Sequence, residues 1–388
     1  MTANSIVSEK PAKPKKPSPD FPLFAHATKR WCKKINGKFH YFGPWDDPDA
    51  ALKKYQDERE AREAGRVPRA VSPDTLTVHK LANEFMLAKE QQRDAGDIRP
   101  TTFSDYHATC KAVLDAFGKD RPVDDLTAID FQLLRARFAK RYGPHALSRE
   151  VQQVRTLFKY GYDAGLIDKP VRFGPMFVRP AKRILRAHRQ QNGDRMFEPA
   201  ELKRLIDAAK VPLKAMILLG INCAYGNTDC ARLPKSVIDL TNGWVKFPRP
   251  KTAVERKCPL WPETIAALKA AMAERPNPKK REHSGLAFLT KYGQPWVKSE
   301  SYDNPVTKEF RKLLDDLKLH RPGLGFYALR HTFETVAGES KDQIAVDHVM
   351  GHVDESMAAR YRERISDDRL HDVVNFVRNW LFAKEKKR

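Results

Sequence analysis

The stretch that decides the fold reads Tyr327-Ala328-Leu329-Arg330-His331-Thr332-Phe333, and two shorter pieces follow it. His352, directly after Gly351, lies 22 residues beyond Arg330, and Tyr361 lies nine residues beyond His352. Apolar residues at three-to-four spacing predict a helix that begins near Tyr327. A guanidinium binds phosphate oxygens with two donors at once, and a phenol can form a covalent ester. Arg330, His352 and Tyr361 are therefore candidate site residues.

A lysine on a hairpin lies ahead of this stretch. Residues 244–247 and 256–260 are two short predicted strands that face each other across Pro250-Lys251-Thr252. Lys251 lies at the turn of this hairpin, although any hairpin can carry a solvated lysine.

In order and spacing, Tyr327, Arg330-His331, Gly351-His352 and Tyr361 resemble the C-terminal signature of the tyrosine recombinase, or phage integrase, family. The hairpin with Lys251 is similar to the one that carries the family's catalytic lysine. The resemblance implies that Tyr361 is the nucleophile and forms a 3′-phosphotyrosine intermediate with DNA. It implies that Arg330 and His352 bind the scissile phosphate and that Lys251 protonates the departing 5′ oxygen. It also implies strand transfer without a cofactor or a metal, in the DNA recombination or integration that mobile elements encode.

Three further residues have supporting roles in this interpretation. Tyr327 occupies a position where the family often has histidine, and its phenol can still donate to a phosphate. His331 either supports Arg330 or contacts DNA, and Asp229 matches the acidic position of an earlier family motif, Gly-x-Arg-x-x-Glu-x-x-x-Leu. That alignment puts Gly226 where the family has its first catalytic arginine.

With glycine at position 226, the sequence alone does not decide whether the protein is catalytically active. The apolar residues over 213–231 predict one helix, on which Arg232 lies roughly 240° around from residue 226 and cannot replace the arginine. A missing donor of this kind costs on the order of 10²–10³ in rate. One hypothesis is a site-specific recombinase or integrase, and the alternative is a catalytically weakened relative that binds specific DNA. A DNA-relaxing topoisomerase or a hairpin-forming resolvase shares the chemistry.

The chain predicts several domains, mainly α with α+β parts. Residues 1–20 predict a flexible basic arm, and residues 21–70 a small β-β-β-α arm-type DNA-binding module with a linker. Helical periodicity then predicts a SAM-like core-binding domain over 74–177, with four or five helices. A basic interdomain linker over 178–196 leads to a mixed α/β catalytic domain with a small sheet over 197–388, which makes the predicted plan that of the family.

Composition favours a nucleic-acid partner. The 388 residues contain 71 Lys and Arg against 49 Asp and Glu, a formal charge of +22. Such an excess favours a polyanion, because binding releases the counterions of its phosphates. The apolar run over 215–221 is far shorter than the roughly 20 residues that cross a membrane. Five scattered cysteines predict reduced thiols, and with no secretion signal or membrane segment the expected location is cytoplasmic, associated with the nucleoid.

Two groups of residues are candidates for contacts with double-stranded DNA and with other protomers. The first is basic, on the predicted strands and in the linker: Lys33, Lys34, Arg179, Lys182, Arg183 and Arg186. The second is an apolar stripe over 370–381, after the nucleophile helix. The resemblance implies that this tail links protomers in a homo-oligomer, a tetramer on DNA, while docking on its own domain is an equally open alternative.

Overall fold

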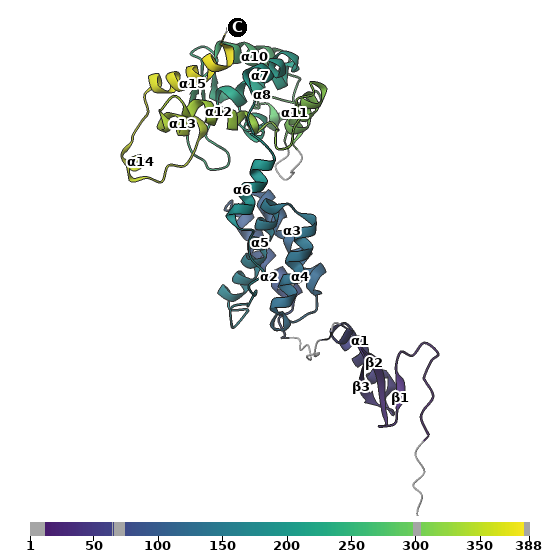
Figure 1. Ribbon diagram of the computed structural model, residues 1–388. Coiled ribbons are helices and arrows are strands. Elements are labelled where there is room, and N and C mark those ends of the chain that lie inside the picture. The colour runs from purple at the N-terminus through teal and green to yellow at the C-terminus, as the bar shows by residue number, and fades with distance from the viewer. Residues whose placement is uncertain (1–11, 64, 66–73, 298–303, 384–388) are drawn as a thin grey trace, which may run out of the picture. The chain divides into compact units, whose positions relative to one another are not determined.

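The computed structural model describes residues 12–63, 65, 74–297 and 304–383. The predicted basic arm lies partly, and the predicted linker before residue 74 mostly, outside these residues. The chain divides into two compact units, residues 1–76 and 77–388. Each unit is described by itself below, with the element labels of Figure 1.

The first unit is a three-stranded antiparallel sheet covered by one helix. The strands β1 (Phe24–His26), β2 (Arg30–Ile35) and β3 (Lys38–Pro44) are in that spatial order, and α1 (Pro48–Glu63) packs on β3. Asn36 and Gly37 have φ angles of 49° and 81°, which suits the tight turn expected of an Asn-Gly pair. The predicted β-β-β-α order is confirmed.

Four helices open the second unit. They are α2 (Val78–Asp94), α3 (Pro100–Phe117), α4 (Ala128–Arg141) and α5 (Pro144–Asp163), with a short 3-10 turn, η1 (Val123–Asp125), between α3 and α4. The Thr77 hydroxyl accepts from the Lys80 N–H and caps α2. The Phe131 ring packs edge-on against Phe117 and Phe158, with centroids 5.3 Å apart in each case. Aromatic packing of this kind fixes α4 against α3 and α5.

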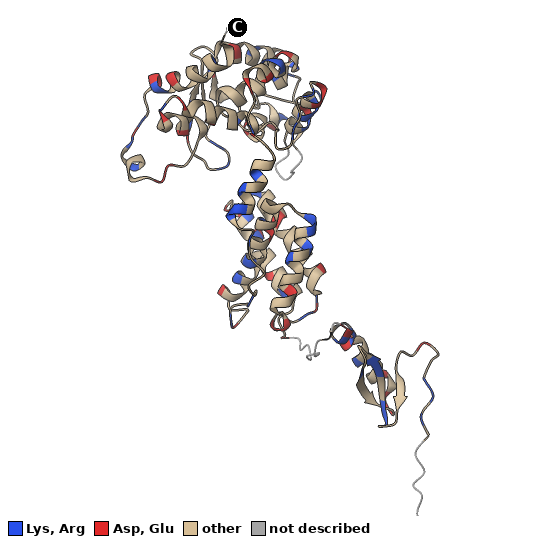
Figure 2. Cartoon of the chain, viewed as in Figure 1, with Lys and Arg blue, Asp and Glu red and all other residues tan. Residues whose placement is uncertain are grey.

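The basic segment that was predicted as a linker contains a helix, α6 (Lys182–Gln191). None of its ten residues, all of which the structure describes, is buried. Lys182, Arg183 and Arg186 are exposed on it, as is Arg179 just before it. Figure 2 shows Lys and Arg residues along α6, so the segment carries several exposed positive charges.

The C-terminal part is built around the apolar helix α8. Its order is α7 (Pro199–Ala208), α8 (Val211–Asn222), α9 (Asn227–Arg232), η2 (Lys235–Val237), β4 (Ile238–Asp239), β5 (Trp244–Lys246), β6 (Lys257–Pro259), α10 (Pro262–Ala273), η3 (Arg281–His283), α11 (Pro305–Asp316), α12 (Ala328–Gly338), α13 (Gln343–Met350), α14 (Met357–Tyr361) and α15 (Asp367–Phe382). Residues 215–222 of α8 are all buried, and α7, α10 and α12 pack on this helix. The small sheet is antiparallel, in the order β4-β5-β6.

The prediction of one helix over residues 213–231 is wrong. The chain leaves α8 at Asn222, passes through a left-handed Ala224 with φ 53°, and starts α9 at Asn227. At the break, the Oδ1 of the fully buried Asn222 side chain accepts from the Trp261 backbone N–H and the Thr264 hydroxyl. A buried amide must be satisfied, and here its partners lie at the β6–α10 corner.

The apolar stripe of α15 packs on its own domain. Leu370, Val373, Val374, Val377 and Leu381 are buried, and α15 contacts α12, α13, α7 and β6. An oligomer contact through this stripe would therefore require α15 to leave these neighbours. All five cysteines are buried and unpaired, which confirms the thiol prediction.

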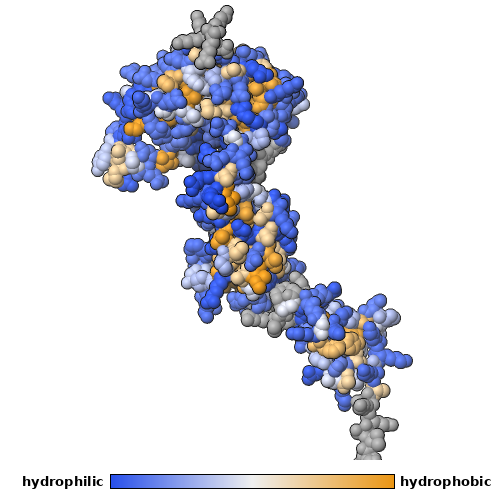
Figure 3. All heavy atoms as spheres, in the orientation of Figure 1, coloured by the Kyte–Doolittle hydropathy of each residue, from blue (hydrophilic) through white to orange (hydrophobic). Residues whose placement is uncertain are grey.

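No described helix is long and apolar enough to cross a membrane. Figure 3 shows a largely hydrophilic visible face with scattered apolar patches.

Ion pairs near the two ends of α15 link this helix to the rest of its domain, and we expect acid to weaken them. Arg369 donates to Asp342 and Arg378 donates to Glu263, and these hydrogen bonds hold the pKa of each carboxyl below its usual range. A carboxyl whose pKa is lower in the folded than in the unfolded state stabilises the fold at pH values above its ordinary pKa near 4. This stabilisation is lost as the pH falls through the folded-state pKa. Each half-exposed pair is worth about 0.5–1 kcal/mol.

We expect Glu263→Gln to lower the free energy of unfolding at pH 7 and to make it less sensitive to acid between about pH 5 and 3. Urea unfolding at several pH values measures this. Glu309→Gln, at an exposed carboxylate of α11, is the matched control and should leave the profile unchanged. An unaltered profile in Glu263→Gln would contradict the role assigned to the pair.

Candidate active site

Arg330 lies in the first turn of α12, and its guanidinium ties three elements together. Its Nη1 donates to the carbonyl of Ala224, after α8, and its Nη2 donates to the carbonyl of Met350, at the end of α13, both at 2.7 Å. The side chain is 2% exposed. Burial, and next the charge of Arg249, lower the pKa of Arg330 to about 10, which leaves it protonated at neutral pH.

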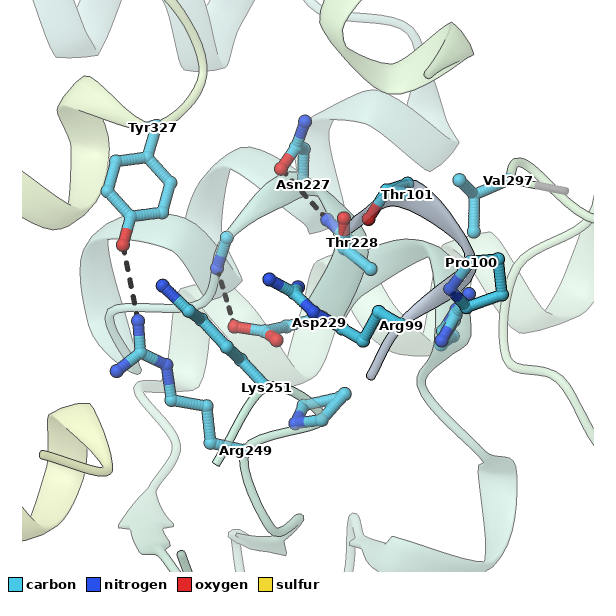
Figure 4. Close-up of a pocket in the computed structure, with 13 residues that line it drawn as sticks. Arg99, Pro100, Thr101, Asn227, Thr228, Asp229, Arg249, Lys251, Val297 and Tyr327 are labelled. Atoms are coloured by element: carbon cyan, nitrogen blue, oxygen red, sulfur yellow. Dashed lines mark hydrogen bonds between the residues drawn. The ribbon is translucent and has the colours of Figure 1, made fainter. Parts of the chain in front are cut away.

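Tyr327 and Lys251 line one pocket beside Arg330. The pocket walls also contain Arg99, Pro100, Thr101, Gly226, Asn227, Thr228, Asp229, Arg232, Arg249, Pro250 and Val297. Figure 4 shows Lys251 and Arg249 reaching from the hairpin toward the Tyr327 ring. Arg249 Nη2 donates to the Tyr327 hydroxyl over 3.3 Å. Four cationic side chains thus face one space, which suits an anion.

Gly226 and Asp229 form the floor of this pocket. The Gly226 N–H donates to the Asp229 carboxylate over 2.9 Å at the start of α9. Arg256 donates from the other side to the same oxygen over 3.3 Å, and its guanidinium lies 4.0 Å from the centre of the Tyr225 ring. Because the chain breaks at residues 223–226, the helical-wheel argument against Arg232 does not hold: Arg232 and Gly226 line the same pocket.

His352 follows the left-handed Gly351, whose φ of 63° ends α13. Its Nδ1 lies 2.9 Å from Asp347 Oδ1, which fixes the orientation of the ring. Glu334 lies near both, and its carboxylate and that of Asp347 each accept from the Gln343 amide. Hydrogen bonds among Gln343, Glu334, Asp347 and His352 thus hold this group together. Strand transfer without a metal stays a prediction.

Tyr361 is not brought to the pocket. It ends the five-residue α14, is 78% exposed, and Figure 1 shows α14 on a loop that stands apart from α12, α13 and α15. The Ser356 hydroxyl caps this helix, and Arg362 pairs with Asp354 over 3.3 Å. The structure therefore gathers Tyr327, Lys251 and Arg330 and leaves the phenol of Tyr361 outside.

His331 faces a second basic pocket. That pocket is lined by Arg186, Arg189, Gln190, Gly193, Asp194, Arg195, Met196, His331 and Thr335. Burial, then the charges of Arg195 and Arg189, lower the pKa of His331. This histidine therefore lies beside the arginines of α6, and its ring also packs against that of Tyr327.

Lys33 and Lys34 lie on opposite faces of the N-terminal sheet. The Lys33 ammonium is over the ring of Tyr55, on the side covered by α1, and the Lys34 ammonium is over the ring of Phe39, on the open side. Consecutive strand residues point to opposite faces of the sheet, so a DNA-binding surface on one face can include only one of these two lysines. Lys34 shares the open face with the half-exposed Phe39.

Sequence reasoning missed Arg249 and Asp347. Arg249 is two residues before Lys251 on the same hairpin, and this spacing could have identified it as a candidate site residue. Asp347 is five residues before His352, a spacing that places an acidic side chain near the imidazole only once the helix ends at Gly351.

Comparison with known proteins identifies a family domain in the C-terminal part of the chain. Residues 195–366 match the model described as "Phage integrase family". The C-terminal part of the chain, residues 195–366, is thus a domain of the phage integrase, or tyrosine recombinase, family. Lys251, Arg330, His352 and Tyr361 all lie inside the matched range.

Two curated transposases are similar to about a third of this chain. The transposase from transposon Tn916 of Enterococcus faecalis and that from transposon Tn1545 of Streptococcus pneumoniae are each 31% identical over 124 residues. The match covers 30% of this chain and 30% of each transposase.

Solved structures share the fold over most of the chain. A lambda integrase dimer bound to a COC′ core site gives a TM-score of 0.57 at 15% identity, over 91% of this chain and 98% of that one. The Tn1549 transposon integrase in complex with a circular intermediate DNA gives 0.55 at 17% identity, over 76% and 97%. These likenesses confirm the fold class: mostly helical, with small antiparallel sheets.

Proposed function

We propose that the protein is a site-specific recombinase or integrase that cleaves and rejoins DNA strands through Tyr361. The observation that carries the proposal is the pocket in which Tyr327, Lys251 and Arg249 converge beside Arg330. Fixed cations in a partly enclosed site stabilise the charge that develops on a phosphate during transfer.

In the proposed reaction the Tyr361 phenolate attacks the phosphorus and the bond to the 5′ oxygen breaks. Lys251 donates its proton to that oxygen, and Arg330 and His352 offset the charge on the non-bridging oxygens. The 5′ hydroxyl of a partner strand then attacks the phosphotyrosine and gives its proton to the neutral Lys251 amine, and the phenolate leaves. The proposal requires α14 to move, because Tyr361 lies outside the pocket.

DNA contacts and assembly belong to the same proposal. The exposed cations Arg179, Lys182, Arg183 and Arg186 are proposed to follow the phosphate backbone, and Lys34 to contact DNA from the N-terminal sheet. A lambda integrase tetramer bound to a Holliday junction has the same fold, with a TM-score of 0.57. This supports a proposed homo-oligomer on DNA.

A second candidate function is sequence-specific DNA binding without efficient cleavage. Gly226 favours it, because the pocket has no side chain at that position to bind phosphate. The two candidates make opposite predictions for a covalent complex.

Tyr361→Phe should abolish a denaturation-resistant protein–DNA adduct while leaving DNA binding intact, because it removes only the nucleophilic oxygen. Nicked suicide duplexes drawn from the DNA that flanks the gene trap such an adduct, and denaturing gel electrophoresis measures it. Tyr292→Phe, at another highly exposed tyrosine, is the matched control and should behave like the parent protein. A parent protein that binds duplexes but forms no adduct would favour the second candidate.

A further inference from the structure

The side chain of Arg249 is held differently from that of Arg330. Its backbone is fixed in the hairpin turn, where the Arg249 N–H donates to Val254 and its carbonyl accepts from Ala253, both at 2.8 Å. Its guanidinium is half-buried and makes two long hydrogen bonds, 3.3 Å to the Tyr327 hydroxyl and 3.4 Å to the Gly351 carbonyl. Bonds of this length are weak, so a phosphate can replace them at low cost.

Arg330 has less freedom to bind a ligand. Both terminal nitrogens already donate to buried carbonyls at 2.7 Å, and 2% of the residue is exposed. Breaking either bond leaves a buried carbonyl without its donor. Of these two guanidinium groups, the one that lines the pocket and can turn toward an entering phosphate is that of Arg249.

The glycine at 226 makes room for this arrangement. A Cβ at residue 226 would lie 3.4 Å from the Tyr327 ring and 3.6 Å from the Asp229 carboxylate. Any longer side chain there would enter the space between these two groups. With glycine, the ring of Tyr327 lies against the start of α9 and its hydroxyl accepts from Arg249.

We propose that Arg249 binds the scissile phosphate from the hairpin side and takes the place of a guanidinium on residue 226. The inference rests on the proposed function. Arg249 transfers no proton and forms no bond to phosphorus; it donates two N–H groups to the non-bridging oxygens and stays charged throughout. Lys251, two residues later, approaches from the same hairpin, so one turn delivers both the proton donor and the oxyanion donor. The mutual repulsion of Arg249 and Arg330, which contributes to the lowered pKa of Arg330, is relieved when an anion lies between them.

Arg249→Ala should lower the rate of adduct formation about 10²–10³-fold, the usual effect of losing one preorganised donor. DNA affinity should change little, because a single phosphate contact among many is lost. Arg249→Lys should give an intermediate rate, since it keeps the charge but loses the two-pronged geometry. Lys246→Ala removes one charge from an exposed position of the neighbouring strand β5 and should keep the parental rate. A parental rate in Arg249→Ala would overturn the inference.

A second measurement decides the contact even if the parent protein forms no adduct, a result that contradicts only the proposed function. Phenylglyoxal labels accessible arginines, and peptide mass spectrometry reads the extent at each residue. In Tyr361→Phe with the nicked duplex bound, Arg249 should be protected, whereas Arg281, exposed in η3, should remain reactive. Equal labelling of Arg249 with and without DNA would show that the inference is wrong.

Discussion

Arg330→Ala is expected to abolish the covalent adduct and also to lower the free energy of unfolding of the C-terminal domain by about 2–5 kcal/mol. The substitution leaves the carbonyls of Ala224 and Met350 buried without their donor, and each such loss costs about 1–3 kcal/mol. These two contacts join the end of α8 to the end of α13, so the segments that carry Gly226 and His352 lose their common support. Urea unfolding and the suicide-duplex assay measure the two effects separately.

Arg321→Ala is the matched control for this result. Arg321 pairs with Glu201 over 2.6 Å and donates to the Met196 carbonyl, in the same domain but away from the pocket. Its side chain is 39% exposed, so its loss should cost about 1 kcal/mol and leave adduct formation intact. An Arg330→Ala protein that is as stable as the parent would contradict the structural part of the prediction.

Local sequence signals predicted most of the fold because turn residues and the spacing of apolar residues determine most of its helices and strands. The Asn36-Gly37 turn needs positive φ at both residues, and the helices of the core-binding region follow the spacing of their buried apolar residues. The same rules failed at residues 223–226, where the apolar pattern continues but the helix does not. There the buried Asn222 amide binds the β6–α10 corner, a long-range contact that helical periodicity does not reveal.

The candidate site, too, could be predicted from the sequence only in part. Tyr327, Lys251 and Arg330 were singled out by spacing, and the structure brings them close together. Spacing along the chain could not show that both terminal nitrogens of Arg330 would be used by backbone carbonyls, or that Arg249 would be turned into the pocket. Nor could it place Tyr361, because none of the residues of α14 is buried and Tyr361 itself is exposed.

Gly351→Ala should reduce the rate of adduct formation about 100-fold, because misplacing catalytic groups by as little as 1 Å has an effect of this size. The residue has φ 63°, which costs alanine about 1 kcal/mol or more. Its Cβ would also lie 3.1 Å from Arg249 Cβ and 3.3 Å from Arg256 Cδ. The chain must shift to relieve these contacts, and the shift moves both the Gly351 carbonyl that accepts from Arg249 and the adjacent His352.

Gly338→Ala separates this effect from a general response to a glycine substitution. Gly338 ends α12, and the nearest atom to a Cβ there is Gln343 Oε1, at 3.9 Å. Alanine should therefore be tolerated or slightly stabilising, since it favours the helix by up to about 1 kcal/mol. Single-turnover cleavage and thermal unfolding of both variants measure the contrast. If Gly351→Ala and Gly338→Ala cleave equally fast, the left-handed step at Gly351 does not position the hairpin arginine and the imidazole for the reaction.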